Sequence, residues 1–557
     1  MTKRKTRVLL VNEASQLSTG FSTIARYMMD RLYSTGKYEL FELGNYLPQN
    51  DHRTFQLPWK QYLSSPDPRD EEYTRAYNST PEAQFGSLMF EKVCLDCRPD
   101  VVINITDEWM QQFIVDSPFR KNYKYIKMAC VDGFPQRMDW MENYKNADVL
   151  LTYSKFGKET IEQESGGSIK VHAVVNPGVD HNVFKPLNKK KELRAKYGLP
   201  EDANIIVSVM RNQQRKLFPD LFRTLRIYID NCIANNRPDL AKNTYLLCNT
   251  SYPDVGWDLG RHIMESKVGS RVLFIKKCDA CGASYAAPFD GEIAPCRKCG
   301  TLAARHTNSN DGITREQLAE VYNCGDLYIQ YSIAEGFGCP VAEAKSCGIP
   351  TMAINHSAMK SQTEGVSGCW ALEPLVLFDE PVTQTEQRRA LPNNEDTAKK
   401  IYKFFCSDEM TKNEWSKSVR KDIEDNYTYE RAAKIFEEAI DSQVIVDHEL
   451  TWLRKDRNFI YPNTEVPRIP LNGSFVDWCI ENILKRPDLV NTYWRDSILR
   501  SINAGVVLER GGRGKFTRED FINKIKNIVD KHNHWEAARL QHFGLEAKNN
   551  KEKFTLV

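Results

Sequence analysis

Two glutamates, Glu335 and Glu343, stand eight residues apart around a glycine-flanked turn. If a helix begins after the turn, the backbone N–H groups from Gly336 to Gly338 lie at the positive end of its dipole. That end of a helix favours an anion such as a phosphate. About two helical turns separate the carboxylates, so we expect Glu343 to lie inside and Glu335 to lie at the mouth of the site. The segment therefore predicts an anion site with two carboxylates.

Two cations follow a predicted strand upstream of this segment. The apolar run 205–210 is rich in β-branched residues, which favours a strand. Arg211 and Lys216 come after it, in the turn before a helix. Because ligands bind at the carboxyl ends of strands in open parallel sheets, these side chains are well placed to hold one. Two fixed positive charges suit a diphosphate.

A pair of Cys-x2-Cys knuckles, each followed by a glycine, gives the sharpest metal-binding signal. Four thiolates at this spacing fit a tetrahedral zinc ion, and the glycines allow backbone amides to wrap the sulfurs. A pair of disulfides is the rival interpretation, which a cytosolic location disfavours. We expect one structural zinc, because four thiolates leave no position for a catalytic water. The predicted ligands are Cys278, Cys281, Cys296 and Cys299.

Length and composition limit the class of protein. At 557 residues the chain is too long for one core, which predicts at least two domains. Its 41% hydrophobic and 27% charged residues are ordinary for a globular enzyme. No apolar run is long enough to span a membrane, and the chain passes from its basic start into a strand without a signal-peptide core. We therefore expect a cytoplasmic protein.

The first half alternates strands and helices, as a doubly wound α/β domain does. Gly20 lies between the first strand and the first helix, where its backbone can approach a ligand. Asp132 follows the third strand, at the edge where parallel sheets bind ligands. It either acts as a base or acceptor-orienting group, or it caps a helix. The expected strands are 8–12, 101–105, 126–131 and 149–152, and the first helix is 22–33.

Four segments, taken in order, resemble one known family. They are the linker-like Val174–Pro186, the pair Arg211 and Lys216, the helix–turn–strand pattern Thr314–Ser332, and Glu335–Glu343. Together they resemble the retaining glycosyltransferases of the GT-B fold, of the group 1 or family four type, over about residues 6–440. Met210 and Leu217 depart from the family, which has glycines at these positions.

The resemblance implies an architecture. In the GT-B fold, two doubly wound Rossmann-like domains face a cleft. It implies an acceptor domain over 1–185 and a donor domain over 186–443, with the zinc ribbon 276–307 as an insertion in the donor domain. Because the ribbon follows the carboxyl end of a strand, we expect it to overhang the cleft. Residues 444–557 form a C-terminal extension that we expect to be mainly helical.

The resemblance also implies the chemistry. A hexosyl or pentosyl group moves from a nucleotide-sugar co-substrate to an unidentified hydroxyl of a glycan, lipid or small molecule, with retention of configuration. The donor phosphate takes the acceptor proton, so we expect no protein nucleophile and no catalytic metal. Glu335 would bind sugar hydroxyls and Glu343 the ribose, and the catalytic candidates are Glu335 and Asp132. The donor-binding residues would be Gly20, Arg211, Lys216, Glu335, Gly336, Phe337, Gly338 and Glu343.

Two other functions remain open. A DNA-modifying glycosyltransferase could use the zinc ribbon and the basic extension to hold a duplex while a hydroxylated base enters the site. Zinc ribbons are common in nucleic-acid proteins, but a net charge of +2 gives no overall basic footprint. A non-enzymatic scaffold that binds a nucleotide or a carbohydrate is disfavoured, because both cations and both glutamates are present together.

Overall fold

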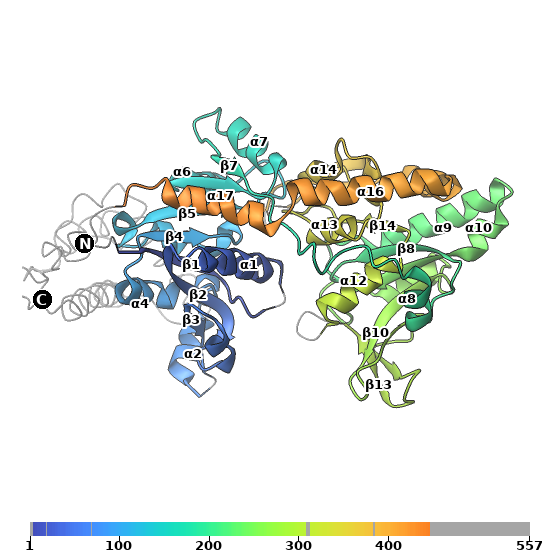
Figure 1. Cartoon of the computed structure of the whole chain (residues 1–557), viewed down its shortest axis with the longest axis horizontal. Coiled ribbons are helices and arrows are strands. Elements are labelled where there is room, and N and C mark those ends of the chain that lie inside the picture. Colours follow the sequence, from blue (N-terminus) through green and yellow to red (C-terminus); the bar gives the residue numbers. More distant parts are fainter. Residues whose placement is uncertain (1–3, 18, 68, 308–311, 382–384, 446–557) are drawn as a thin grey trace, which may run out of the picture. The chain divides into compact units, whose positions relative to one another are not determined.

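The computed structural model describes residues 4–17, 19–67, 69–307, 312–381 and 385–445 (Figure 1). The chain divides into two compact units. Within the described ranges, one unit spans residues 4–86, 101–112 and 124–443, and the other spans residues 87–100, 113–123 and 444–445. The predicted helical extension, 444–557, lies outside the described residues except for Val444 and Ile445. None of the described helices is long and apolar enough to cross a membrane.

Seven parallel strands form the first sheet, in the order β3-β2-β1-β4-β5-β6-β7. The order reverses between β1 and β4, as in a doubly wound sheet. Both of these strands are aliphatic and largely buried, which is typical of parallel strands covered on both faces. The strands are β1 (Thr6–Glu13), β2 (Tyr38–Pro48), β3 (Lys60–Ser65), β4 (Val101–Asn104), β5 (Lys124–Ala129), β6 (Val149–Thr152) and β7 (Ala173–Val174).

Helix α1 (Gly20–Ser34) follows β1, as the sequence predicts. The Thr19 hydroxyl accepts a hydrogen bond from the Ser22 amide and caps the helix. The other helices of this half are η1 (His52–Gln56), α2 (Glu71–Tyr77), α3 (Pro81–Gln84), α4 (Ser87–Cys97), η2 (Glu108–Met110), α5 (Gln112–Val115), η3 (Arg120–Asn122), α6 (Met138–Lys145) and α7 (Lys155–Glu164).

The second sheet has nine strands, in the order β12-β13-β10-β9-β8-β14-β15-β16, with β11 paired to β10. Strand β10 starts as the parallel partner of β9 and then pairs antiparallel with β11 and β13. The ribbon strands therefore extend the second sheet itself. They do not form a separate insertion on a loop after β10. The strands are β8 (Asn204–Val209), β9 (Thr244–Asn249), β10 (Val272–Cys278), β11 (Ser284–Ala287), β12 (Ile293–Pro295), β13 (Leu302–His306), β14 (Leu327–Gln330), β15 (Thr351–Ile354) and β16 (Cys369–Leu372).

A separate antiparallel hairpin, β17 (Pro374–Asp379) with β18 (Arg388–Pro392), follows the second sheet. The capping box of Thr314 and Gln317 starts α12, where the sequence predicts a helix. The helices of this half are α8 (Lys190–Tyr197), α9 (Phe218–Ala234), α10 (Pro238–Asn243), α11 (Leu259–Glu265), α12 (Arg315–Asn323), α13 (Cys339–Ser346), α14 (Ser357–Thr363), α15 (Asn394–Cys406), α16 (Glu409–Asn426) and α17 (Tyr429–Asp441).

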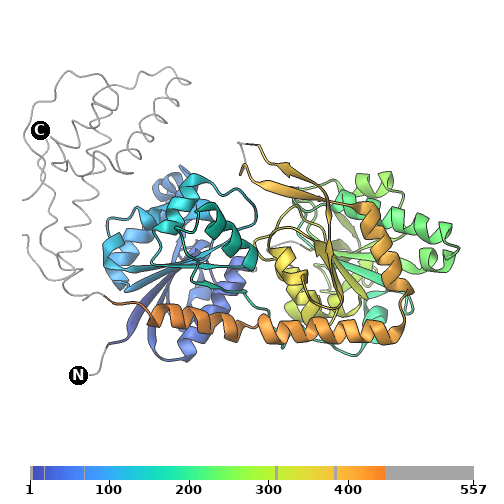
Figure 2. The same cartoon turned by 90° about the horizontal axis from the view of Figure 1, so that it is seen from above.

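The last helix, α17, lies alongside α1 and the first sheet (Figures 1 and 2). The rings of Tyr27 and Tyr429 stack with centroids 3.9 Å apart. Tyr38 Oη donates to Asp441 at 2.7 Å. Through these contacts the terminal helix returns from the second sheet to the first. The predicted domain boundary between residues 185 and 186 stays a prediction.

Candidate active site

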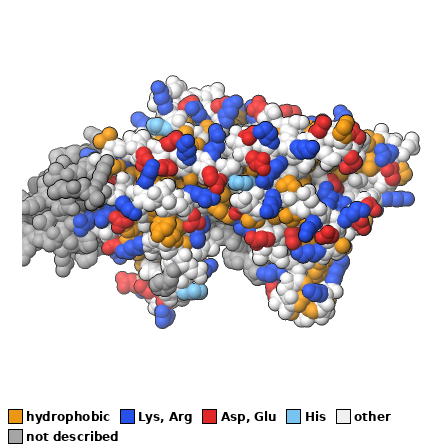
Figure 3. Space-filling view, in the orientation of Figure 1, with side chains coloured by type: hydrophobic (Ala, Val, Ile, Leu, Met, Phe, Trp, Pro, Cys, Tyr) orange, Lys and Arg blue, Asp and Glu red, His pale blue; other side chains and the backbone are white. Residues whose placement is uncertain are grey.

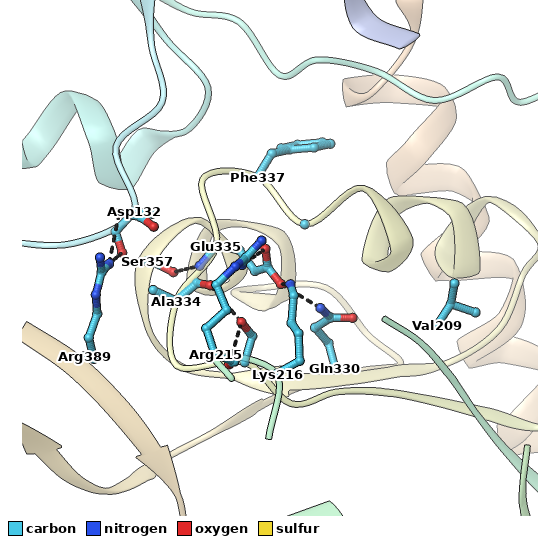
Figure 4. A network of polar contacts seen from close by, with 12 residues as sticks. Asp132, Val209, Arg215, Lys216, Gln330, Ala334, Glu335, Phe337, Ser357 and Arg389 are labelled. Carbon is cyan, nitrogen blue, oxygen red and sulfur yellow. Dashed lines mark hydrogen bonds and ion pairs between the residues drawn. The ribbon is translucent and has the colours of Figure 1, made fainter. Parts of the chain in front are cut away.

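Glu335 lies at the centre of a network of charged side chains (Figure 4). It follows β14 and is only 6% exposed. The Lys216 ammonium group pairs with its Oε1, and Arg215 Nη1 donates to its Oε2 at 2.9 Å. Gln330 Nε2 also donates to Oε1, at 2.8 Å. The turn between β8 and α9 supplies both cations, and β14 precedes Glu335. Strands of the second sheet therefore position the carboxylate and both of its cationic partners.

The two cations set the protonation of this carboxylate. Burial by itself raises the pKa of Glu335, but the charges of Lys216 and Arg215 outweigh burial and lower that pKa to about 2. Burial also lowers the pKa of Lys216, and the charge of Arg215 adds to this effect, so that this pKa falls to about 8 in spite of Glu335. At neutral pH the three side chains together therefore carry a net positive charge.

The backbone after Glu335 has the turn that the sequence predicts. The Glu335 amide donates to Ser357 Oγ at 2.9 Å, and Ser357 is buried with a φ of 53°, which is uncommon outside glycine. Gly338, with a φ of 88°, is the N-cap of α13, and glycine adopts this conformation without strain. Phe337 is buried, and its ring centroid lies 6.0 Å from that of Tyr427.

Two glycines lie near the start of α13, and one of them marks a close approach. A Cβ at Gly336 would lie 2.2 Å from Cys130 Sγ, so a side chain there would displace its neighbour. Gly20 is the first residue of α1, and a Cβ on it would lie 4.0 Å from Sγ of Cys339, the first residue of α13. The N-termini of the two helices therefore lie side by side, and each is the positive end of a helix dipole.

Arg211 has a different partner. Its Nε and Nη2 donate to the Asp254 carboxylate at 2.8 and 3.0 Å, and its side chain is 48% exposed. Arg215, which the sequence interpretation did not select, lies beside Glu335 instead. The only sign in the sequence that Arg215 belongs to the site was its position next to Lys216, in a turn that also contains Arg211.

The two glutamates are buried in the opposite order from the predicted one. Glu335 is well buried, whereas Glu343 on α13 is only half-buried, so the expectation that Glu343 lies deeper was wrong. Burial of a carboxylate is costly unless a cation compensates it, and the sequence spacing does not show which glutamate meets the cations. Glu343 instead accepts a hydrogen bond from Tyr322 Oη at 2.8 Å. Burial raises the pKa of Glu343, and Tyr322 and Arg315 offset this only in part.

Asp132 is held by Arg389 of β18. Arg389 Nη1 donates to the backbone oxygen and to Oδ1 of Asp132, at 2.9 Å each. The guanidinium is buried, while the Asp132 side chain is 34% exposed. Burial, followed by the charge of Asp132, raises the pKa of Asp107 to about 6 although Lys127 opposes the shift. The next helix, α6, has Arg137 as its N-cap, so Asp132 is not the helix cap that we considered.

The four predicted zinc ligands form a cluster. Their sulfur atoms all lie within 4.8 Å of one another. Sγ of Cys278 is 3.7 Å from that of Cys299, and Sγ of Cys281 is 3.8 Å from that of Cys296. A tetrahedral zinc ion with Zn–S bonds of about 2.3 Å requires sulfur separations of about 3.8 Å. The Lys298 amide donates to Cys296 Sγ at 3.3 Å. The cluster therefore fits a zinc ribbon.

Sequence comparisons match the segment that carries the site. Residues 304–370, which include both glutamates, match the family described as glycosyl transferases group 1. A D-inositol 3-phosphate glycosyltransferase of Thermobispora bispora is 26% identical over 219 residues, or 37% of this chain and 42% of that protein. The enzyme of the same name from Mycolicibacterium smegmatis is 27% identical over 196 residues, or 35% of each protein. This confirms the resemblance to the group 1 glycosyltransferases. The chain spans less than half the length of these curated relatives.

Solved structures support the fold over a longer stretch. A sucrose-phosphate synthase from Thermosynechococcus elongatus has a TM-score of 0.56 at 14% identity, and a glycosyltransferase from Rickettsia africae has 0.53 at 14%. Each comparison covers 79% of this chain and 100% of the other. HepE of Anabaena, solved with UDP and glucose, has a TM-score of 0.51 at 12% identity over the same shares. The chain therefore has the predicted GT-B fold.

Charged side chains of both signs are interspersed over the face of this glycosyltransferase-like chain in Figure 3. Neither sign dominates that face, which agrees with the net charge of +2. Nucleic acid as a partner stays a prediction, because the basic segment of the extension lies outside the described residues.

Proposed function

We propose that this protein is a retaining glycosyltransferase that moves a hexosyl or pentosyl group from a nucleotide-sugar to a hydroxyl acceptor. The observation that carries the proposal is the ionised Glu335, held between Arg215 and Lys216 where α1 and α13 begin. The match to group 1 glycosyltransferases includes this glutamate. UDP-sugars are the first donors to test, because HepE was solved with UDP and glucose.

The donor diphosphate would bind where positive charge is in excess. Arg215 and Lys216 share one carboxylate, so Glu335 neutralises only one of their two charges. The helix starts near Gly20 and Gly338 add the positive ends of two dipoles. These charges are in place before the donor arrives, and they would stabilise negative charge that develops on the leaving diphosphate. Arg211 would add a further cation by exchanging Asp254 for phosphate.

The carboxylates would hold the sugar side of the donor and the acceptor. Once the diphosphate pairs with the cations, Glu335 is available to accept hydrogen bonds from sugar hydroxyls. Glu343 would accept from the ribose, and Asp132 would orient the acceptor hydroxyl. In same-face attack, the acceptor oxygen bonds to the anomeric carbon as its bond to the diphosphate breaks, and the acceptor proton passes to that diphosphate. This step retains configuration without a protein nucleophile.

We also propose that Cys278, Cys281, Cys296 and Cys299 hold one structural zinc ion. Four thiolates fill its coordination sphere, so the ion would supply folding energy to the ribbon and no catalytic water. The predicted cytoplasmic location belongs to the same proposal, because thiols stay reduced in that compartment.

The decisive experiment is to incubate the pure protein with a panel of nucleotide-sugars and to follow nucleoside-diphosphate release. We expect turnover with at least one donor, and NMR of the product should show the anomeric configuration of the donor. Glu335→Gln should lose most of the turnover, whereas Lys399→Ala, which removes an exposed lysine of α15, should keep it. No turnover with any donor would refute the proposed activity. An inverted product would refute retention alone.

A further inference from the structure

The β17–β18 hairpin brings polar side chains to the loop after β5, which holds Asp132. The Arg388 amide donates to the Phe134 carbonyl at 2.6 Å, so β18 is bonded to the backbone of this loop. Arg389 Nη1 reaches Asp132, and its Nε lies 3.0 Å from Glu380 Oε2. The hairpin is therefore part of the surroundings of the carboxylate proposed to orient the acceptor.

Gln387, beside Arg389 on the same segment, has a side-chain amide without a partner. It is 1% exposed, and both its Nε2 and Oε1 lack a hydrogen bond among the described residues. A Cβ on Gly133 would lie 3.0 Å from Gln387 Oε1, so the amide lies against the loop that carries Asp132. Buried polar atoms are rarely left unpaired, and this amide can both donate to and accept from a hydroxyl group.

The charges in this region differ from those proposed to bind the diphosphate. Arg389 is shared by two carboxylates, Asp132 and Glu380, so that the three side chains carry a net negative charge when ionised. Asp107 is also nearby, since burial and then the charge of Asp132 raise its pKa, but Lys127 and Arg215 act on it in the opposite direction, so the excess negative charge is that of Asp132 and Glu380. A phosphate group on the acceptor would meet excess negative charge here, whereas uncharged hydroxyls would meet donors and acceptors of hydrogen bonds.

We propose that Asp132, Gln387 and Arg389 form the acceptor subsite, and that this subsite takes an uncharged polyhydroxyl compound and rejects its phosphate esters. The inference rests on the proposed glycosyltransferase function. Asp132 and Gln387 contact acceptor hydroxyls, and Arg389 is a positioning residue that holds Asp132 in place. The hairpin thereby selects the acceptor, while the turn after β8 binds the donor.

Matched pairs of acceptors test the charge preference. The full-length protein is given the donor that it turns over best, together with glucose or glucose 6-phosphate, and with myo-inositol or D-inositol 3-phosphate. Transfer is measured as the glycosylated product, and donor hydrolysis as nucleoside diphosphate released without an acceptor. We expect the neutral member of a pair to be preferred roughly tenfold or more, because like charges at a binding site are strongly unfavourable.

Two substitutions connect that preference to the hairpin. Glu380→Gln removes one negative charge beside Arg389, so it should narrow the preference for the neutral member by about tenfold. Glu373→Gln is the matched control, because Glu373 is exposed just before β17 and contacts Asn355 rather than Asp132; it should leave the preference unchanged.

Gln387→Met keeps the side-chain length but removes both polar atoms, so it should lower the ratio of transfer to hydrolysis by about tenfold. The same variant should not lower the thermal unfolding temperature, since no internal hydrogen bond is lost.

The outcomes separate this inference from the function on which it rests. Absence of turnover with every donor would overturn the glycosyltransferase proposal and this inference with it. Donor hydrolysis accompanied by equal or better transfer to the phosphorylated members, or by transfer to neither member of any pair, would overturn the inference alone. An unchanged preference in Glu380→Gln would also overturn it. A large loss of thermal stability in Gln387→Met would show that Gln387 has a structural role.

Discussion

Replacement of Lys216 by methionine tests the proposed donor site most directly. Methionine keeps a similar volume in a buried position but removes the charge. Glu335 would still be paired with Arg215 and would still accept from Gln330, so the carboxylate is not left as an uncompensated buried charge. We therefore expect Lys216→Met to fold, and its near-UV circular dichroism should match that of the wild type.

The catalytic loss in Lys216→Met should be large. A preorganised charge that stabilises a developing anion contributes about 2–4 kcal/mol to the transition state. At about 1.36 kcal/mol for each factor of ten, kcat/KM for donor hydrolysis should fall by about 30- to 900-fold. Arg211→Met is the matched control: Arg211 is half exposed and already paired with Asp254, so its loss should be smaller. A value for Lys216→Met within a few-fold of the wild type would remove Lys216 from the donor site.

The pH profile supplies a second measurement on the same residue. Only the protonated form of Lys216 can bind phosphate as a cation, and its pKa is lowered to about 8. The wild-type kcat/KM should therefore fall as pH rises through about 8, since this ratio reports groups of the free enzyme. Glu335, with a pKa of about 2, stays ionised throughout this range. Lys216→Met should lose this alkaline limb, and an unchanged limb in that variant would assign the titration to another group.

Other substitutions separate the roles of neighbouring residues. Glu335→Gln should mainly lower kcat, because its sugar contact strengthens as positive charge builds on the anomeric carbon, while Glu343→Gln should mainly raise the donor KM; the reverse pattern would contradict these roles. Gly336→Ala should impair donor turnover, and Cys130→Ala in the same chain should restore it; no recovery would exclude that steric contact. Elemental analysis should find about one zinc per chain, and Cys296→Ser should lose the metal and unfold the ribbon strands β11, β12 and β13 while the parallel strands of both sheets stay folded; zinc retained in this variant would refute the ligand assignment.

Local chemistry explains which parts of the fold and the site could be predicted. The glycine turn after Glu335, the N-cap at Gly338 and the two cysteine knuckles depend on residues close together in the sequence, and the structure has each of them. Alternating strands and helices likewise predict a doubly wound sheet. These features require only backbone preferences and short spacings.

Partners that are distant in the sequence were not predictable in the same way. Lys216 and Glu335 are 119 residues apart, and Arg389 and Asp132 are 257 apart. No spacing rule identifies such pairs, so the sequence showed neither the role of Arg215 nor the pairing of Asp132. The prediction of which glutamate is more deeply buried was wrong for the same reason. The position of the cations decides which carboxylate can be buried, and the sequence does not show that position.

The shared carboxylate gives the proposed site a way to couple donor binding to sugar recognition. In the free protein Glu335 compensates Arg215 and Lys216, which keeps two like charges together beside one buried carboxylate. A diphosphate brings at least two negative charges and competes for the same cations. Glu335 then exchanges an ion pair for hydrogen bonds to sugar hydroxyls, which only an intact nucleotide-sugar offers together with the diphosphate. A free nucleoside diphosphate would leave this buried carboxylate without the sugar hydroxyls, so the exchange favours the intact donor over the product.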